Sequence, residues 1–178
     1  YFEKNYGFLS KEDYQESIKT GAPKKGVVLT FDDGFKDHYK HVLPELNKRG
    51  LWGIFYITTA QYLNNKLLGV HRVHFLKGKY GSSFILKEVL KKTKDYMINP
   101  NLIEQFSNTT YHFFEREEDE KKLQILLNYY IDYDFRDKIL DSLMIDLFDE
   151  SELFKKTYLN KDEIIKLHEY GNIIGPHT

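Results

Sequence analysis

The chain has 178 residues, of which 41% are hydrophobic and 16% aromatic, so it can bury a core and is not intrinsically disordered. Its formal net charge of −1, with no basic stripe that alternates with aromatic residues, excludes a general nucleic-acid-binding protein, and no apolar run has the length of a membrane span. Because there are no cysteines, disulfides and thiolate metal sites are excluded, and any metal must be bound by histidine and carboxylate.

The N-terminal part of the chain alternates between helix and strand signals. Ser10, followed by acidic residues at 12 and 13, predicts the start of a helix that ends by Gly21. A strand is predicted over 26–31, and apolar residues at helical spacing then predict a helix that Gly50 ends. A second buried strand is predicted over 54–57. Strands that alternate with helices indicate an α/β fold with a parallel sheet.

The segment of about 61–159 interrupts this alternation, and we interpret it as a helical insertion between two strands. Two apolar stripes at helical spacing predict helices there, formed by Leu123, Leu126, Leu127, Tyr130 and Ile131 and by Leu140, Leu143, Met144, Leu147 and Phe148. The simplest role of these stripes is a core, although a lid or a substrate-selecting surface stays open. After the insertion, Asn160 and Glu163 predict a capping box, and the strand pattern resumes at Ile173.

The strongest chemical signal is the motif Thr30–Gly34, which directly follows the apolar run 27–29. Two adjacent carboxylates at the end of a buried strand are costly unless a ligand or a reaction uses them. Because the chain turns at the strand end, Asp32 and Asp33 can reach one cleft in different roles. The alternative is that Asp33 and Gly34 form only a solvated turn.

The last residues, Ile173–Thr178, repeat this arrangement. A short apolar strand is followed by a glycine break and then by His177, whose imidazole is a usual metal ligand. Asp32, Asp33 and His177 thus all fall at the carboxyl ends of predicted strands.

With these two motifs, the chain resembles the polysaccharide deacetylases of carbohydrate esterase family four. The family's first motif, Thr-Phe-Asp-Asp-Gly, is complete at Thr30–Gly34, and its second, His-Ser/Thr-x-x-His, begins at His177. Flanking residues such as 43–46 extend the resemblance. It implies a single but incomplete domain over 1–178, which forms part of a distorted (β/α) barrel and carries the helical insertion.

The resemblance also implies a function and roles for the site residues. The protein is expected to be a hydrolase that removes N-acetyl or O-acetyl groups from a carbohydrate substrate with the help of a divalent metal ion, expected to be zinc. Asp32 would be the general base that activates water, Asp33 and His177 would be metal ligands, and Thr178 would orient the local turn. A carboxylate and imidazoles leave open positions on such an ion, as catalytic sites need.

The chain departs from the family where the second motif is interrupted. The third ligand, a histidine four positions after His177, would lie beyond Thr178, as would the family's later motifs. We therefore expect the chain to be the front part of a longer protein. The 178 residues alone are expected to be inactive and to bind a divalent ion weakly.

Other readings of the histidines and of the function stay open. His71 and His74 are three residues apart, a usable metal spacing, but the simpler prediction is that they are polar side chains of a helix, with Arg72 as a surface or phosphate contact. The remaining histidines, His38, His41, His112 and His168, have no ligand partner in register. Alternative functions are a non-catalytic carbohydrate-binding or scaffold protein and an aspartate-nucleophile phosphatase, although the latter requires Asp-x-Asp rather than adjacent acids.

Overall fold

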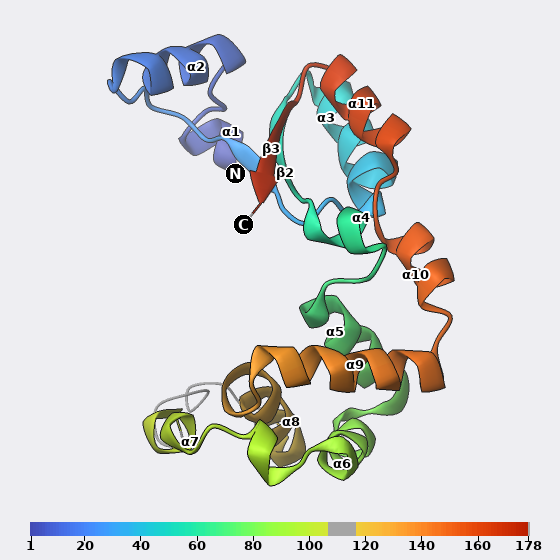
Figure 1. The fold of residues 1–178 in the computed structure, drawn as a ribbon. Helices are drawn as coiled ribbons and strands as arrows, with labels where there is room; N and C mark the ends of the chain where they lie inside the picture. Colours follow the sequence, from blue (N-terminus) through green and yellow to red (C-terminus); the bar gives the residue numbers. More distant parts are fainter. Residues whose placement is uncertain (107–116, 178) are drawn as a thin grey trace. The chain divides into compact units, whose positions relative to one another are not determined.

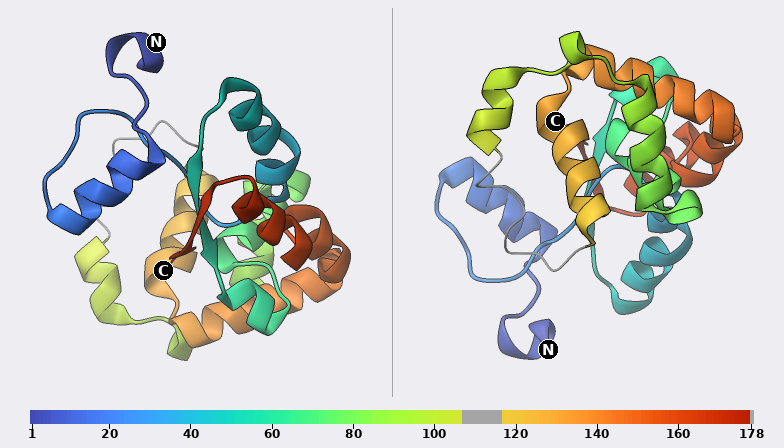
Figure 2. Two further views of the ribbon diagram at one scale, coloured as in Figure 1. Left: turned by 90° about the horizontal axis from the view of Figure 1, so that it is seen from above. Right: turned by 90° about the horizontal axis from the view of Figure 1, so that it is seen from below.

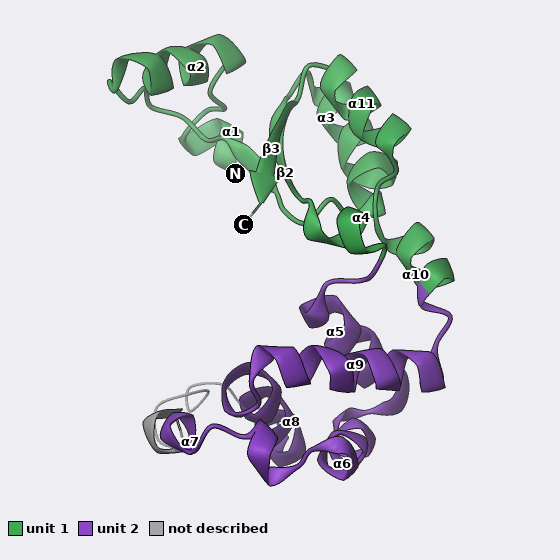
Figure 3. Ribbon diagram, in the orientation of Figure 1, with its two compact units in different colours: residues 1–65, 151–178 green, residues 66–150 purple. Residues whose placement is uncertain are grey.

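The computed structural model of the protein describes residues 1–106 and 117–177 (Figure 1). The chain divides into two compact units, which Figure 3 colours separately. Unit 1 comprises Tyr1–Asn65 and Ser151–Thr178, and unit 2 comprises Lys66–Glu150. Unit 2 lies within the segment of about 61–159 for which a helical insertion is predicted. That the chain forms one incomplete domain with an insertion stays a prediction.

Unit 1 contains a small parallel sheet. Its strands are β1 (Leu29–Phe31), β2 (Gly53–Thr58) and β3 (Ile173–His177), in the order β1-β2-β3. Phe31 is opposite Phe55 in one pair, and Thr58 is opposite His177 in the other, so all three strands end at one edge. The predicted α/β class with a parallel sheet is confirmed. The described residues form an open sheet and no closed barrel.

The first strand is shorter than the predicted 26–31. Residues before β1 pair with the N-terminal segment instead, because the Val27 amide donates to the Gly7 carbonyl (2.9 Å) and the Leu9 amide donates to the Val27 carbonyl (3.0 Å). A Cβ on Gly26 would lie 3.0 Å from the Leu9 backbone, so glycine permits this close approach. Local strand propensity therefore located the strand but not its pairing partner.

One face of the sheet is covered by α3 (Leu43–Arg49) and α11 (Lys161–Glu169), which Figures 1 and 2 show on the same side. Phe55 and Ile57 of β2 point into this layer, and Phe55 is fully buried. The helices contribute the other buried residues of the core, which are Leu43, Leu46 and Leu167, together with Leu159 from the loop before α11. Burial of apolar surface stabilises a fold by about 25 cal/mol per Å². Burial of these side chains is therefore the main interaction that holds the sheet and its helices together.

The helix signals near both ends of unit 1 are confirmed. The Ser10 side chain accepts a hydrogen bond from the Asp13 amide (3.1 Å), and Gly21 ends α2 (Lys11–Thr20) in the left-handed conformation. Gly50 ends α3 in the same way. The capping box of Asn160 and Glu163 is complete, with hydrogen bonds of 2.9 and 2.8 Å. The other helical segments of unit 1 are α1 (Phe2–Asn5), the π-helix η1 (His38–Val42) and α4 (Ala60–Asn64); α10 (Glu150–Thr157) begins at the last residue of unit 2.

Unit 2 is helical throughout its described part. Its elements are α5 (Gly69–Tyr80), α6 (Ser82–Lys92), η2 (Asp95–Met97), α7 (Pro100–Phe106), α8 (Glu118–Ile125), η3 (Leu126–Tyr130) and α9 (Tyr133–Leu147). Both predicted apolar stripes contribute to its core, in which Leu123, Leu140 and Met144 are fully buried. Among the described residues, no helix has the length and apolar character needed to cross a membrane.

Candidate active site at the carboxyl edge of the sheet

The predicted site residues lie together at the carboxyl edge of the sheet. Asp32 and Asp33 directly follow β1, and His177 is the last residue of β3. The His177 Nδ1 lies 3.8 Å from Oδ1 of Asp33, and its Nε2 lies 3.8 Å from Oδ2 of Asp32. The imidazole is therefore located between the two carboxylates, at distances longer than a hydrogen bond.

The two aspartates differ in their access to solvent. The Asp32 side chain is 58% exposed, whereas that of Asp33 is 25% exposed. An exposed carboxylate can meet a substrate from solution, and a more enclosed one is better fixed in place. This difference matches the roles that the family resemblance implies for the two residues, although those roles stay a prediction.

The turn after β1 has an uncommon backbone. Asp33 has φ of 69° and Gly34 has φ of 66°, so two successive residues are left-handed. Aspartate tolerates this region better than most residues do, and glycine adopts it freely. A Cβ on Gly34 would also lie 3.3 Å from Cγ2 of Ile57 and 3.4 Å from the hydroxyl of Tyr62. Both the backbone angle and the tight space therefore require glycine at position 34.

Hydrogen bonds from outside the motif hold this turn. The Gln61 side-chain amide donates to the Asp33 carbonyl (3.1 Å), and the Leu159 amide donates to the Gly34 carbonyl (2.9 Å). The Tyr62 hydroxyl in turn donates to the Leu159 carbonyl (2.9 Å). Gln61 is 1% exposed, so α4 places a buried polar side chain directly behind the aspartates. We call Gln61, Tyr62 and Leu159 the turn-supporting residues.

The sequence reasoning missed the turn-supporting residues, because it assigned all of them to the insertion of about 61–159. The structure instead places them in unit 1, beside the Asp32–Gly34 turn. The one signal that could have drawn attention to them is their position, since Gln61 and Tyr62 come shortly after a predicted buried strand. Residues at such strand ends often support a site.

Tyr62 gives a testable consequence of this arrangement. Burial raises the pKa of the Tyr62 hydroxyl to about 12. The pKa of Tyr62 in the folded state lies above the ordinary value of 10.0. The protonated hydroxyl therefore contributes fully to the free energy of unfolding below pH 10, and this contribution is lost as the pH rises toward 12. We expect Tyr62→Phe to lower the free energy of unfolding by about 1 kcal/mol at neutral pH, since one hydrogen bond is lost. Denaturant unfolding of the unchanged protein and of Tyr62→Phe, from pH 7 upward, measures the difference in their free energies of unfolding. A difference that stays constant beyond pH 11 would contradict the raised pKa of Tyr62.

His38 is a core residue and no candidate ligand. It is buried among the rings of Phe31, Phe35 and Phe55, whose centroids lie 5.6 to 5.9 Å from its own. Burial lowers its pKa, and the nearby charges of three aspartates oppose this shift only in part. Within the described part of the chain, its Nδ1 has no hydrogen-bond partner. His38 is therefore a ring-packed core side chain behind the site.

The other histidines that the structure describes do not join the site. His41 and His168 are exposed on helices of unit 1, and His71 and His74 lie on α5 in unit 2. Across residues 1–106 and 117–177, no group of three or more metal-ligating side chains is close enough to hold an ion. His112 and Thr178 lie outside the described residues.

The prediction that Arg72 is a surface or phosphate contact is wrong. Its side chain is 4% exposed and donates to both carboxylate oxygens of Glu150 (2.7 and 3.0 Å). It also pairs with Asp141 at 2.9 Å. Arg72 is thus a buried ion-pair residue that ties α5 to α9 and to the end of unit 2.

Comparison with known proteins agrees with the motif Thr30–Gly34, which contains the turn. Residues 19–96 match the family model of polysaccharide deacetylases. The matched range contains the complete motif Thr30–Gly34 and ends before His177. No curated protein and no solved structure matches the chain. The match confirms the resemblance to polysaccharide deacetylases, and it supports a hydrolase that acts on acetyl groups of carbohydrates.

Proposed function

From this family match we propose that the protein removes N-acetyl, or alternatively O-acetyl, groups from a carbohydrate, with the help of a divalent metal ion. The observation that carries the proposal is the meeting of Asp32, Asp33 and His177 at one sheet edge, from strands far apart in the sequence. We further propose that the open sheet of unit 1 is part of a (β/α) barrel, in which active sites lie at this edge.

The side chains at this edge fit part of a zinc site. Asp33 and His177 offer a carboxylate and an imidazole, a donor pair that suits zinc. Two ligands of a tetrahedral zinc ion, each about 2.1 Å from the metal, are about 3.4 Å apart. The Asp33 Oδ1 to His177 Nδ1 distance of 3.8 Å is close to this value, so a small side-chain shift suffices. When bound, a divalent ion would supply Lewis-acid activation of water and of the acetyl carbonyl.

The protein residues have separate tasks in this proposal. Asp32 accepts the proton of the attacking water, because its carboxylate is exposed and stands beside the ligands. His177 separates the two carboxylates, so that Asp33 can be occupied as a ligand while Asp32 keeps a free oxygen. Gln61 and Leu159 fix the carbonyls of the turn, so both aspartates start from a defined backbone.

Acetate release from N-acetylated oligosaccharides by the complete protein tests this proposal. We expect release in the presence of zinc, its loss in a chelator, and its recovery when the ion is returned. Release that a chelator leaves unchanged would contradict the role of the metal. If the metal-loaded protein binds the sugars but releases no acetate from N-acetyl or O-acetyl substrates, the non-catalytic alternative is favoured.

A further inference from the structure

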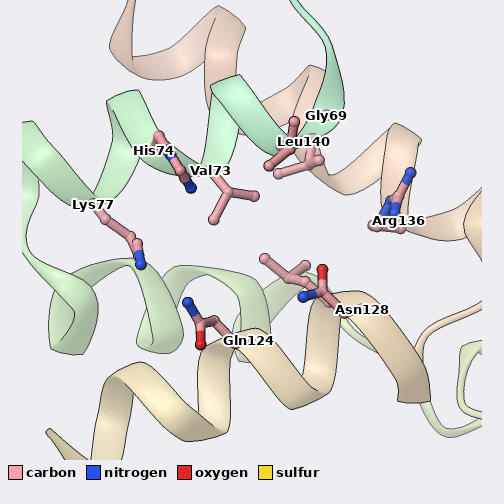
Figure 4. A pocket seen from close by; sticks show the side chains of 10 residues that line it. Gly69, Val73, His74, Lys77, Gln124, Asn128, Arg136 and Leu140 are labelled. Atoms are coloured by element: carbon pink, nitrogen blue, oxygen red, sulfur yellow. The ribbon is translucent and has the colours of Figure 1, made fainter. Parts of the chain in front are cut away.

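We propose that a basic cavity in unit 2 binds a small oxyanion, either a carboxylate or a phosphate group. The cavity has a volume of about 90 Å³ and lies between α5, α9 and the helical segment formed by α8 and η3 (Figure 4). It is lined by Gly69, Val70, Val73, His74, Lys77, Gln124, Leu127, Asn128, Arg136 and Leu140. All these residues belong to unit 2.

The polar side chains of the cavity have the chemistry of an anion site. Lys77 and Arg136 are cations, and Gln124 and Asn128 carry amide N–H groups that are hydrogen-bond donors by type. Among the described residues of unit 2, no aspartate or glutamate lines the cavity. Figure 4 shows His74 on one side of the space, Gln124 and Asn128 on the other, and Lys77 and Arg136 toward its two ends. Such a lining favours an occupant with negative charge.

The apolar lining strengthens this preference. Val70, Val73, Leu127 and Leu140 are its apolar side chains, and Leu127 and Leu140 are buried. Next to such side chains the local dielectric is lower than in water, so a charge-assisted hydrogen bond is stronger than on an open surface. The two cationic side chains are themselves mostly enclosed, at 15% exposure for Lys77 and 19% for Arg136.

Existing ion pairs hold both cations in place and leave donors for a ligand. The Lys77 ammonium donates to Glu120 (2.6 Å), which accepts one of its three N–H groups. The Arg136 guanidinium donates from Nε and Nη2 to Asp137 (3.3 and 3.2 Å), and it has five N–H groups. These ion pairs already order both side chains. Binding of an anion would therefore cost little further side-chain entropy.

The cavity has room for a small ligand. Its volume of about 90 Å³ is more than a single water molecule needs. It can admit a carboxylate or phosphate group, either as a small free anion or as the charged group of a larger molecule. The simpler alternative is a gap between helices that contains only water. The proposal does not depend on deacetylation, because it concerns other residues and is tested by binding.

Titration of the 178-residue chain with inorganic phosphate and with acetate, followed by amide NMR shifts, tests this site. We expect saturable shifts centred on the cavity residues, with a Kd of about 1 mM or tighter for the better anion. Arg136→Gln should weaken binding about tenfold through loss of charge-assisted hydrogen bonds. Lys138→Gln is the matched control, since Lys138 lies on the same helix and carries the same charge but does not line the cavity. Its Kd should stay within about twofold of the unchanged chain.

A second variant tests the space rather than the charge. A Cβ on Gly69 would lie 3.5 Å from Nη2 of Arg136, an ordinary contact, so Gly69→Ala keeps the fold and every charge while it takes room from the anion. Gly69→Ala should also weaken binding of the anion.

The comparison of the two anions identifies the ligand. Tighter binding of phosphate than of acetate would assign the cavity to a phosphate group, and tighter binding of acetate would assign it to a carboxylate. Absence of saturable shifts, or equal weakening by Arg136→Gln and Lys138→Gln, would overturn the proposal.

Discussion

Replacement of Asp32 by asparagine is expected to lower acetate release by about 10²- to 10⁴-fold while the metal content stays nearly unchanged. The amide keeps the shape of the side chain but cannot accept the proton of the attacking water. It should leave the metal in place because the proposed ligands, Asp33 and His177, are untouched. Turnover and metal content, measured on the same preparation of the complete protein, separate these two effects.

Asp33→Ala should have the opposite pattern, because it removes a ligand and empties the site. Asp37→Asn serves as the control. Asp37 is a nearby aspartate outside the proposed site; its side chain is 80% exposed, and its Oδ1 lies 3.9 Å from Nε2 of His41. Its replacement should therefore leave both turnover and metal content unchanged. If Asp32→Asn removed the metal and Asp33→Ala retained it, the roles of the two aspartates would be reversed.

Signals that act within a few residues were predictable from the sequence. The Ser10 cap, the glycine ends of α2 and α3, and the capping box of Asn160 depend on contacts three to five residues apart, and all are present. The order of strands and helices followed from the same local periodicity. That Asp32, Asp33 and His177 fall at strand ends was predictable from the same pattern, and the resemblance to polysaccharide deacetylases implied that such ends form the active site.

Contacts between distant residues were not predictable in the same way. Gln61 supports the Asp33 carbonyl from 28 positions away, and nothing in the local sequence identifies that partner. The shortening of β1 has a similar cause, since Val27 pairs with the N-terminal segment rather than with β2. Arg72 looked like a surface residue because its partner Glu150 lies 78 positions along the chain. Tertiary pairing, which a single sequence does not encode locally, decided each of these cases.

Arg72→Met is therefore expected to destabilise unit 2 by about 3 kcal/mol, at the lower end of the range for breaking a buried ion pair. Arg72 is 4% exposed and bridges two carboxylates, so its loss removes the guanidinium that pairs with Glu150 and leaves Asp141 with Lys66. The cost stays at the lower end because these carboxylates are 20% and 36% exposed and can be hydrated in part. Hydrogen exchange of the α5 and α9 amides measures the loss within unit 2 itself.

Lys66→Met is the matched control, because Lys66 also pairs with Asp141 (2.9 Å) but is 48% exposed. An exposed pair contributes about 1 kcal/mol or less, so the two substitutions should differ clearly. Burial by itself would raise the pKa of the Asp141 carboxyl, but the hydrogen bond from Lys66 and the charge of Arg72 lower it below its ordinary 3.8. The ionised Asp141 carboxylate therefore adds to the stability of the fold above pH 3.8, and this contribution is lost as the pH falls further. The destabilisation caused by Arg72→Met should accordingly become smaller in acid. Equal effects of Arg72→Met and Lys66→Met would show that the buried position of Arg72 adds nothing.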